Sequence, residues 1–325
     1  MKKTIIFSLI IMALLFSCKK KSITTSPVEN TPTPVFLPGK DWFKSTDTAA
    51  FSARYWHTSL THNNLMWVIG GGEGSSSKND VWYSSDGVVW GCTTTAAAFP
   101  ARAAQANLEY NNLMWVIGGS NIVSLTNDVW YSSDGAAWGC TTTASAFSPR
   151  YGHSSMVYNG LMWVIGGNDG SYLLNDVWYS SDGKTWLRAT AGAAFAGRLG
   201  HTSVVYNNKM WVIGGYDGTK SYNDVWYSSD GVAWGCTTTA AAFSARNMHT
   251  SVVYNNLMWV IGGGDDTNLS NDVWYSSDGK TWTQATATAG FSGRAGHTSV
   301  VYNNAMWIIG GFDGTKVLND VLYSP

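Results

Sequence analysis

The sequence predicts an all-β fold, a β-propeller of six blades in which each blade is a four-stranded antiparallel sheet. Two observations lead to this prediction: a 48-residue unit occurs six times without insertion, and each copy contains short strand patterns separated by turn residues. A third is that the last copy ends after its third strand, while a segment before the first copy matches the missing fourth strand. We therefore expect the first strand to complete the last blade and close the ring.

Three residue types recur at the 48-residue step and define the repeat. The arginines are Arg54, Arg102, Arg150, Arg198, Arg246 and Arg294. The aspartates of an Asn-Asp-Val motif are Asp80, Asp128, Asp176, Asp224, Asp272 and Asp320. A tryptophan recurs at Trp67, Trp115, Trp163, Trp211, Trp259 and Trp307. Each copy is therefore expected to adopt the same structure.

The fourth copy illustrates the strand pattern. Its predicted strands cover residues 201–206, 210–213, 224–228 and 232–237. Asn207-Asn208 and Asp230-Gly231 form the tight turns, because these residues tolerate positive φ, and Gly214-Gly215 closes the second strand. A single meander of four strands cannot bury both of its faces, so the copies are expected to stack radially.

The two ends of the chain support a closed ring. The segment 39–42 matches 279–282, and Trp42 precedes Trp90 by one full repeat, in the place of a fourth-strand tryptophan. The sixth copy stops at Pro325, just after its third strand. The alternative, an open stack of six sheets, leaves two exposed edges rich in Trp and Val, which favour aggregation.

The repeat resembles the kelch repeat over residues 39–325. The resemblance rests on the double glycine, the Asn-Asp-Val-Trp-Tyr strand and the fourth-strand tryptophan, with Leu322 the only replacement at the Trp82 position. It implies a propeller fold, and in some kelch propellers arginines just before the innermost strand bind acidic peptides. Some six-bladed kelch propellers resemble sialic-acid epimerases, and some seven-bladed ones are copper oxidases of galactose, whose copper tyrosines and thioether cysteine have no counterpart here.

Residues 1–17 are predicted to be a lipoprotein signal peptide. Lys2 and Lys3 precede the apolar run 4–16, and the sequence 15–18 resembles a lipobox with Cys18 as the lipidated residue. Residues 18–38 then form a Thr/Pro-rich tether. We expect lipid anchoring at the bacterial cell envelope, in the outer membrane or at the cell surface. The alternatives are an ordinary signal peptide or an N-terminal transmembrane anchor, for which the run is short.

The charge of the predicted propeller argues against nucleic acid as a partner. From Gly39 onward there are 15 Lys and Arg and 20 Asp and Glu residues, so the net charge is 15 − 20 = −5. A domain with this balance has no basic field for a phosphate backbone. We therefore expect no nucleic-acid partner and no contact with the membrane other than the lipid.

The ligand site is expected on one face of the propeller. The turns between strands one and two and between three and four share a face, which we call the tight-turn face, and both turns are short. The loops between strands two and three share the opposite, long-loop face with the links between blades, and loops of this kind carry most binding sites. The candidate ligand-binding residues there are Arg54, Tyr55, Trp56, Arg102, Arg150, Tyr151, Arg198, Tyr216, Arg246, Arg294 and Phe312.

The candidate residues leave two questions open. Each repeat arginine is followed, at a constant spacing within its copy, by a repeat aspartate on the same face, so the arginines either pair with these aspartates or contact ligand. The aromatic residues depart from the repeat, and Trp56 is the only tryptophan off it. Their rings suit a sugar or a peptide, or they only pack the loops.

Histidines and cysteines at repeat positions are interpreted as structural. His57, His153, His201, His249 and His297 begin strand one, with Gln105 in the remaining copy, and a ring of such residues does not converge on one metal ion. Cys92, Cys140 and Cys236 follow fourth-strand tryptophans on the outer rim, too far apart for disulfides. The alternative for the cysteines is pairing between molecules.

The sequence contains no nucleophile with its base, no isolated carboxylate pair and no phosphate-binding loop. We therefore expect a non-enzymatic binding module without cofactor or metal, which recognises a protein or a glycan. A sugar-modifying enzyme similar to the sialic-acid epimerases is the alternative, and a purely architectural role in an envelope assembly is a third possibility.

Overall fold

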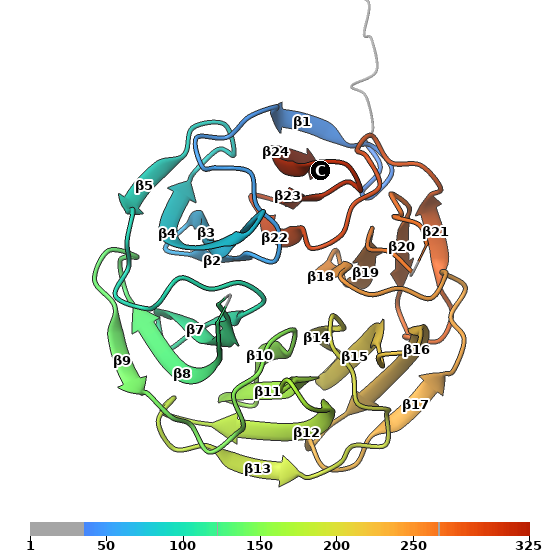
Figure 1. Ribbon diagram of the computed structural model, residues 1–325. Helices are drawn as coiled ribbons and strands as arrows, with labels where there is room; N and C mark the ends of the chain where they lie inside the picture. The colour runs from blue at the N-terminus through green and yellow to red at the C-terminus, as the bar shows by residue number, and fades with distance from the viewer. Residues whose placement is uncertain (1–35, 122, 266) are drawn as a thin grey trace, which may run out of the picture. The chain divides into compact units, whose positions relative to one another are not determined.

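The computed structural model describes residues 36–121, 123–265 and 267–325 of the chain. The predicted signal peptide, Cys18 and most of the predicted tether lie outside these residues. Residues 36–325 form one compact unit, in which 24 strands make six four-stranded antiparallel sheets. Figure 1 shows the six sheets arranged as the blades of a propeller around a central axis. The predicted fold class is confirmed.

The first three blades follow one another along the chain, and the innermost strand of each comes first. Blade one contains β2 (Thr58–His62), β3 (Leu65–Glu73), β4 (Ser76–Ser84) and β5 (Gly91–Thr94). Blade two contains β6 (Ala106–Tyr110), β7 (Leu113–Ser120), β8 (Leu125–Ser132) and β9 (Gly139–Thr142). Blade three contains β10 (Ser154–Tyr158), β11 (Leu161–Asn168), β12 (Leu173–Ser180) and β13 (Leu187–Thr190).

The last three blades repeat this order, but the sixth takes its outer strand from the start of the domain. Blade four contains β14 (Thr202–Tyr206), β15 (Lys209–Tyr216), β16 (Ser221–Ser228) and β17 (Gly235–Thr238). Blade five contains β18 (Thr250–Tyr254), β19 (Leu257–Ile261), β20 (Val273–Ser276) and β21 (Thr283–Thr286). Blade six contains β22 (Thr298–Tyr302), β23 (Ala305–Phe312), β24 (Val317–Ser324) and β1 (Phe43–Thr46).

In every blade except blade five the middle strands are longer than the sequence pattern predicts. In blade four the second strand runs through the double glycine to Tyr216, and the third begins at Ser221. The pairing shifts between Ile213 and Gly215, so the glycines form a bulge within the ladder and do not end it. The hairpin turn is as predicted, with Asn207 and Asn208 both at positive φ.

The hydrophobic core is divided among the interfaces between neighbouring blades. Between blades six and one, Trp307 and Ile309 pack with Met66 and Val68, and Phe51 of the connecting link joins them. Five equivalent clusters fill the other interfaces. Every blade therefore buries its two faces against two neighbours.

The N-terminal segment reproduces the outer strand of every other blade. Strand β1 pairs antiparallel with β24, and Phe43 faces Tyr323 as Gly91 faces Tyr83 in blade one. Gly39 lies against the ring of Trp259 as Gly87 of the turn before β5 lies against Trp307, and an added Cβ would come within 2.3 Å of the Trp259 ring. The predicted closure is therefore present, and the chain enters the propeller on its tight-turn face.

Candidate functional site

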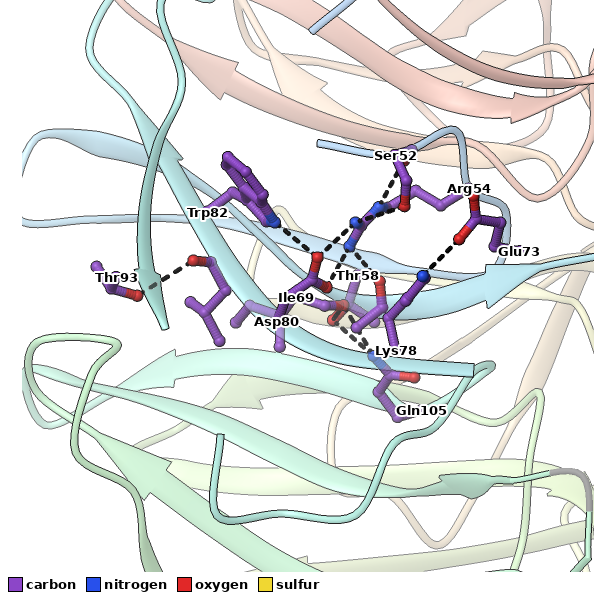
Figure 2. A network of polar contacts seen from close by, with 12 residues as sticks. Ser52, Arg54, Thr58, Ile69, Glu73, Lys78, Asp80, Trp82, Thr93 and Gln105 are labelled. Atoms are coloured by element: carbon purple, nitrogen blue, oxygen red, sulfur yellow. Dashed lines mark hydrogen bonds and ion pairs between the residues drawn. The ribbon is translucent and has the colours of Figure 1, made fainter. Parts of the chain in front are cut away.

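The repeat arginines lie inside the blades beside the repeat aspartates. In blade one the Arg54 guanidinium donates to both carboxylate oxygens of Asp80 at 2.8 Å (Figure 2). It also donates to the Gly70 carbonyl oxygen at 2.8 Å. The Trp82 indole donates to the same carboxylate. Burial opposes ionisation of Asp80, but the hydrogen bonds and charge of Arg54 outweigh it and lower the pKa of Asp80 below its usual value.

The same ion pair forms in all six blades. The other five are Arg102–Asp128, Arg150–Asp176, Arg198–Asp224, Arg246–Asp272 and Arg294–Asp320. The six arginines are at most 1% exposed. This geometry favours the structural interpretation of the arginines, because the guanidinium groups are buried and bound in bidentate pairs. Contact of the arginines with a ligand stays a prediction.

A closed ring of backbone hydrogen bonds surrounds the axis on the long-loop face. Six equivalent residues, one per blade, each donate an amide N–H to the carbonyl oxygen of the equivalent residue in the preceding blade, over N–O distances of 2.8–3.0 Å. We call these residues the mouth ring; they are Trp56, Ala104, Gly152, Gly200, Met248 and Gly296. The bond from Trp56 to Gly296 joins the first blade to the last and completes the circle.

The mouth ring holds three residues in an unfavourable backbone conformation. All six members have positive φ, which glycine adopts freely at three of the positions. Trp56, Ala104 and Met248 have φ of 52°, 52° and 53°, in the left-handed region that costs a residue with a side chain about 1–2 kcal/mol. Trp56 and Met248 are therefore present despite an unfavourable backbone conformation, and residues of this kind are often found at functional sites.

An apolar cavity lies beside Trp56, and we call it the Trp56 pocket. Its volume is about 320 Å³, and its lining residues are Tyr55, Trp56, Gly74, Met248, Ala295, Gly296, Phe312 and Val317. The ring of Tyr55 lies 5.6 Å from that of Trp56 and 6.5 Å from that of Phe312, between centroids. Residues from blades one, five and six thus converge in one pocket on the long-loop face.

A second, more polar cavity adjoins the other side of Tyr55 and Trp56. We call it the serine cavity; it has a volume of about 470 Å³, and its polar lining residues include Ser75, Ser76, Ser77, Ser120 and Asn121. Tyr151 of the link before blade three also lines it. Tyr55 and Trp56 therefore form a wall between an apolar and a hydroxyl-rich space.

The structure unites some of the predicted aromatic residues and separates others. Tyr55, Trp56 and Phe312 share the Trp56 pocket. Tyr216 does not join them, since it lies at the end of β15 in blade four and pairs through its backbone with Leu199. Whether any of them contacts a ligand stays a prediction.

Sequence reasoning missed Met248, Ala295 and Val317. A signal existed for Met248, because the equivalent position is glycine in three copies and Met248 departs from the repeat as Trp56 does. No such signal exists for Ala295 and Val317, since they become pocket residues only through the convergence of blades.

The five histidines and Gln105 line the central channel just below the mouth ring. In four of them the ring Nε2 lies 2.9–3.2 Å from a Ser or Thr hydroxyl of the preceding blade, in the pairs His57–Thr298, His201–Ser154, His249–Thr202 and His297–Thr250. Burial, followed by the charge of the nearby arginines, lowers the pKa of His153, His201 and His297 to about 3. No group of three or more potential metal ligands is found among the described residues.

Stability is expected to fall between pH 6.5 and pH 4. In this range the histidines of the unfolded chain bind protons, whereas His153, His201 and His297 of the folded chain stay neutral, so acid favours unfolding. Urea unfolding at several pH values measures the effect. The control replaces all five channel histidines by Gln, the residue at position 105, because burial also lowers the pKa of His57 and His249 well below the usual value; this variant should flatten the curve between pH 6.5 and pH 5. A wild-type curve that is flat in this range would show that the histidines are not held neutral.

The cysteines of the outer strands are free thiols. Cys92, Cys140 and Cys236 lie on β5, β9 and β17, where they are exposed and unpaired within the described part of the chain. Burial of the thiol, partial as it is, and then the negative charge of the nearby repeat aspartate raise their pKa above the usual value. The rim position predicted for them is confirmed.

The repeated four-stranded blades, the buried Arg–Asp pairs and the ring closure define a six-bladed β-propeller built from one repeated motif. A family profile described as the KLHDC2/KLHL20/DRC7 Kelch-repeats domain matches residues 39–189 and 179–324. The chain therefore belongs to the kelch-repeat family, as the resemblance implied.

Comparison with solved structures shows the same architecture elsewhere. A chain described as "Structure of YjhT" superposes with a TM-score of 0.70 at 17% identity, and the match covers 86% of this chain and 96% of that one. At this identity the similarity shows the fold alone. A comparison with curated proteins gave no match. Within residues 36–121, 123–265 and 267–325 no helix has the length and hydropathy of a membrane span.

Proposed function

We propose that this protein is a non-catalytic binding module, held at the cell envelope by a lipid on Cys18, that recognises a protein or glycan ligand on its long-loop face. The observation that carries the proposal is the convergence of Tyr55, Trp56 and Phe312, all departures from the repeat, around one open pocket. Repeated positions are explained by folding, whereas these side chains are not needed for the repeat.

The chemistry of the cavities supports binding over catalysis. Within the described residues, no Asp, Glu, Lys or Arg lines the Trp56 pocket, the serine cavity or the channel mouth. The acids and bases of this domain are largely engaged in the Arg–Asp pairs and in the Asp-Gly turns. A general acid–base reaction at these cavities would therefore depend on buried histidines that stay neutral, which are weak bases.

The position of the first described residues is compatible with an anchored module. Gly39 occupies a turn position on the tight-turn face, opposite the Trp56 pocket. A tether that joins the propeller there leaves the long-loop face free for a ligand.

Loss of Trp56 should weaken ligand binding without unfolding the protein. Trp56→Gly removes the wall between the two cavities and relieves the positive φ, so the fold is expected to persist. We expect saturable binding by the wild type to a glycan array or a displayed peptide library, and binding at least about tenfold weaker in the variant, equivalent to about 1.4 kcal/mol. Thermal unfolding verifies the fold.

The matched control is Tyr172→Ala, which removes an exposed aromatic side chain from another loop, between β11 and β12. Binding that is equally weakened in both variants, or in neither, would refute the Trp56 pocket as the place where the ligand binds. Turnover of a bound sugar, detected as anomer exchange by NMR, would instead support the sugar-modifying alternative.

A further inference from the structure

The Trp56 pocket lies between two residues with positive φ, Trp56 and Met248, which flank a glycine in the mouth ring. Along the mouth ring the order is Met248, Gly296 and Trp56, in blades five, six and one. Trp56 lies over Gly296 so closely that an added Cβ at Gly296 would come within 2.9 Å of the indole Cδ1. Glycine at position 296 thus makes room for Trp56, and Met248 lines the same pocket.

The lining of the Trp56 pocket offers almost no directional hydrogen bonds. Apart from the Trp56 indole N–H, the only polar side-chain group among its lining residues is the Tyr55 hydroxyl, which lies 3.4 Å from the Gly74 carbonyl oxygen. A sugar ring presents hydroxyls on all its edges, and burying them without partners costs about 1–3 kcal/mol each. An apolar group loses nothing by this transfer and gains from it.

The neighbouring serine cavity has the opposite character. Its hydroxyl and amide groups, including Ser75, Ser77 and Asn121, can accept and donate hydrogen bonds, and no charged side chain of the described chain lines it. A ligand that spans both cavities therefore needs one apolar group next to an uncharged, hydrogen-bonding stretch. An extended polypeptide has this combination, with a side chain on one side and amide groups along its backbone.

We propose that the ligand of the long-loop face is a polypeptide segment without charge at this point, which inserts one large apolar side chain into the Trp56 pocket and lays its backbone across the serine cavity. This inference rests on the proposed function and assigns Met248 and Ala295 as the residues that set the size of the accepted side chain.

The test uses four capped tripeptides, acetyl-Gly-Xaa-Gly-amide with Xaa = Ala, Leu, Phe or Trp, together with methyl glucoside and methyl galactoside. The probe is the ¹³C-methyl NMR resonance of Met248, which is assigned by its loss in Met248→Gly. We expect the Phe and Trp peptides to shift this resonance in a saturable manner. Their dissociation constants should be about tenfold lower than that of the Ala peptide, because burying a large apolar side chain contributes a free energy of this order.

Two variants separate binding from folding. Met248→Gly places glycine where three copies already have it, so the protein should unfold at an equal or higher temperature than the wild type. Its affinity for the Trp peptide, measured by NMR of the ligand, should be about tenfold lower. Ala295→Leu introduces the residue found at the equivalent position 199, and should fill the pocket and abolish the shift of Met248. Tyr172→Ala should change neither property.

The outcomes distinguish this inference from the function on which it rests. Binding of the glycosides in preference to the peptides would overturn the inference and leave a glycan-binding module. Equal affinity for the Ala and Trp peptides would overturn the apolar anchor. No binding of any probe to the wild type would overturn both the inference and the proposed face.

Discussion

Arg198→Met is expected to lower the free energy of unfolding by about 3–5 kcal/mol, because it leaves a buried carboxylate without its partner. The Arg198 side chain is fully buried and donates to both oxygens of Asp224, at 2.7 and 2.9 Å, and to the Gly214 carbonyl oxygen. It also lies over the rings of Phe195 and Tyr222. Urea unfolding followed by tryptophan fluorescence measures the change.

Two further variants test whether the loss of stability in Arg198→Met comes from the unpaired carboxylate. The double variant Arg198→Met, Asp224→Leu removes both charges and should recover much of the loss, since a buried ion pair is often replaceable by apolar residues of similar size. Arg188→Ala removes an exposed arginine from β13, whose guanidinium lies over the ring of Trp178, and should lower stability by no more than about 1 kcal/mol. If Arg198→Met were as mild as Arg188→Ala, the pair would not contribute to the fold as its burial implies.

Removal of residues 1–48 is expected to open the ring and cause self-association. The deletion exposes the edge of β24, which pairs with β1, and uncovers Phe291, whose ring contacts Trp42 at 5.2 Å. It also weakens the hydrogen bonds from Asn319 to the carbonyl oxygens of the link between β1 and β2, because Ala49 becomes a free end. An unpaired edge of this kind recruits other strands. Light scattering coupled to size-exclusion chromatography detects the oligomers.

A point variant tests the same closure in the intact chain. Trp42→Ala should lower the free energy of unfolding by about 3 kcal/mol, at the low end of the values for aromatic truncation, because Trp42 is only partly buried. The equivalent residue Trp90 is only 5% exposed, so Trp90→Ala should lower the free energy of unfolding by more than Trp42→Ala. A shortened protein that stays monomeric and as stable as the full chain would show that β1 does not close the ring.

The local elements were predictable because each copy repeats the same short-range signals. Asn207-Asn208 specifies a tight turn whatever surrounds it, since the backbone preference of Asn for positive φ is intrinsic. The two-residue turn predicted at Asp230-Gly231 was wrong, because β17 begins only at Gly235 and the Asp230 carboxylate accepts hydrogen bonds from amides within a longer link. The double glycine was misjudged as a strand end, because whether Gly214 and Gly215 stop a strand or bulge within it depends on the pairing partner, Tyr222. The aromatic candidates Tyr55, Trp56 and Phe312 were identified from their departure from the repeat, whereas Tyr216 departs in the same way and lies elsewhere.

Counting equivalent residues along the chain was enough to establish the repeat period, the number of blades and the segment that closes the ring. Which residues of the long-loop face meet depends instead on the closed tertiary structure. Trp56, Met248 and Phe312 lie far apart in the sequence and become neighbours because the ring brings blade one beside blade six. The sequence spacing likewise could not show that the arginines are buried. A constant step from each arginine to its aspartate fits both an ion pair and an exposed ring of charge, and only the packing around each guanidinium distinguishes the two.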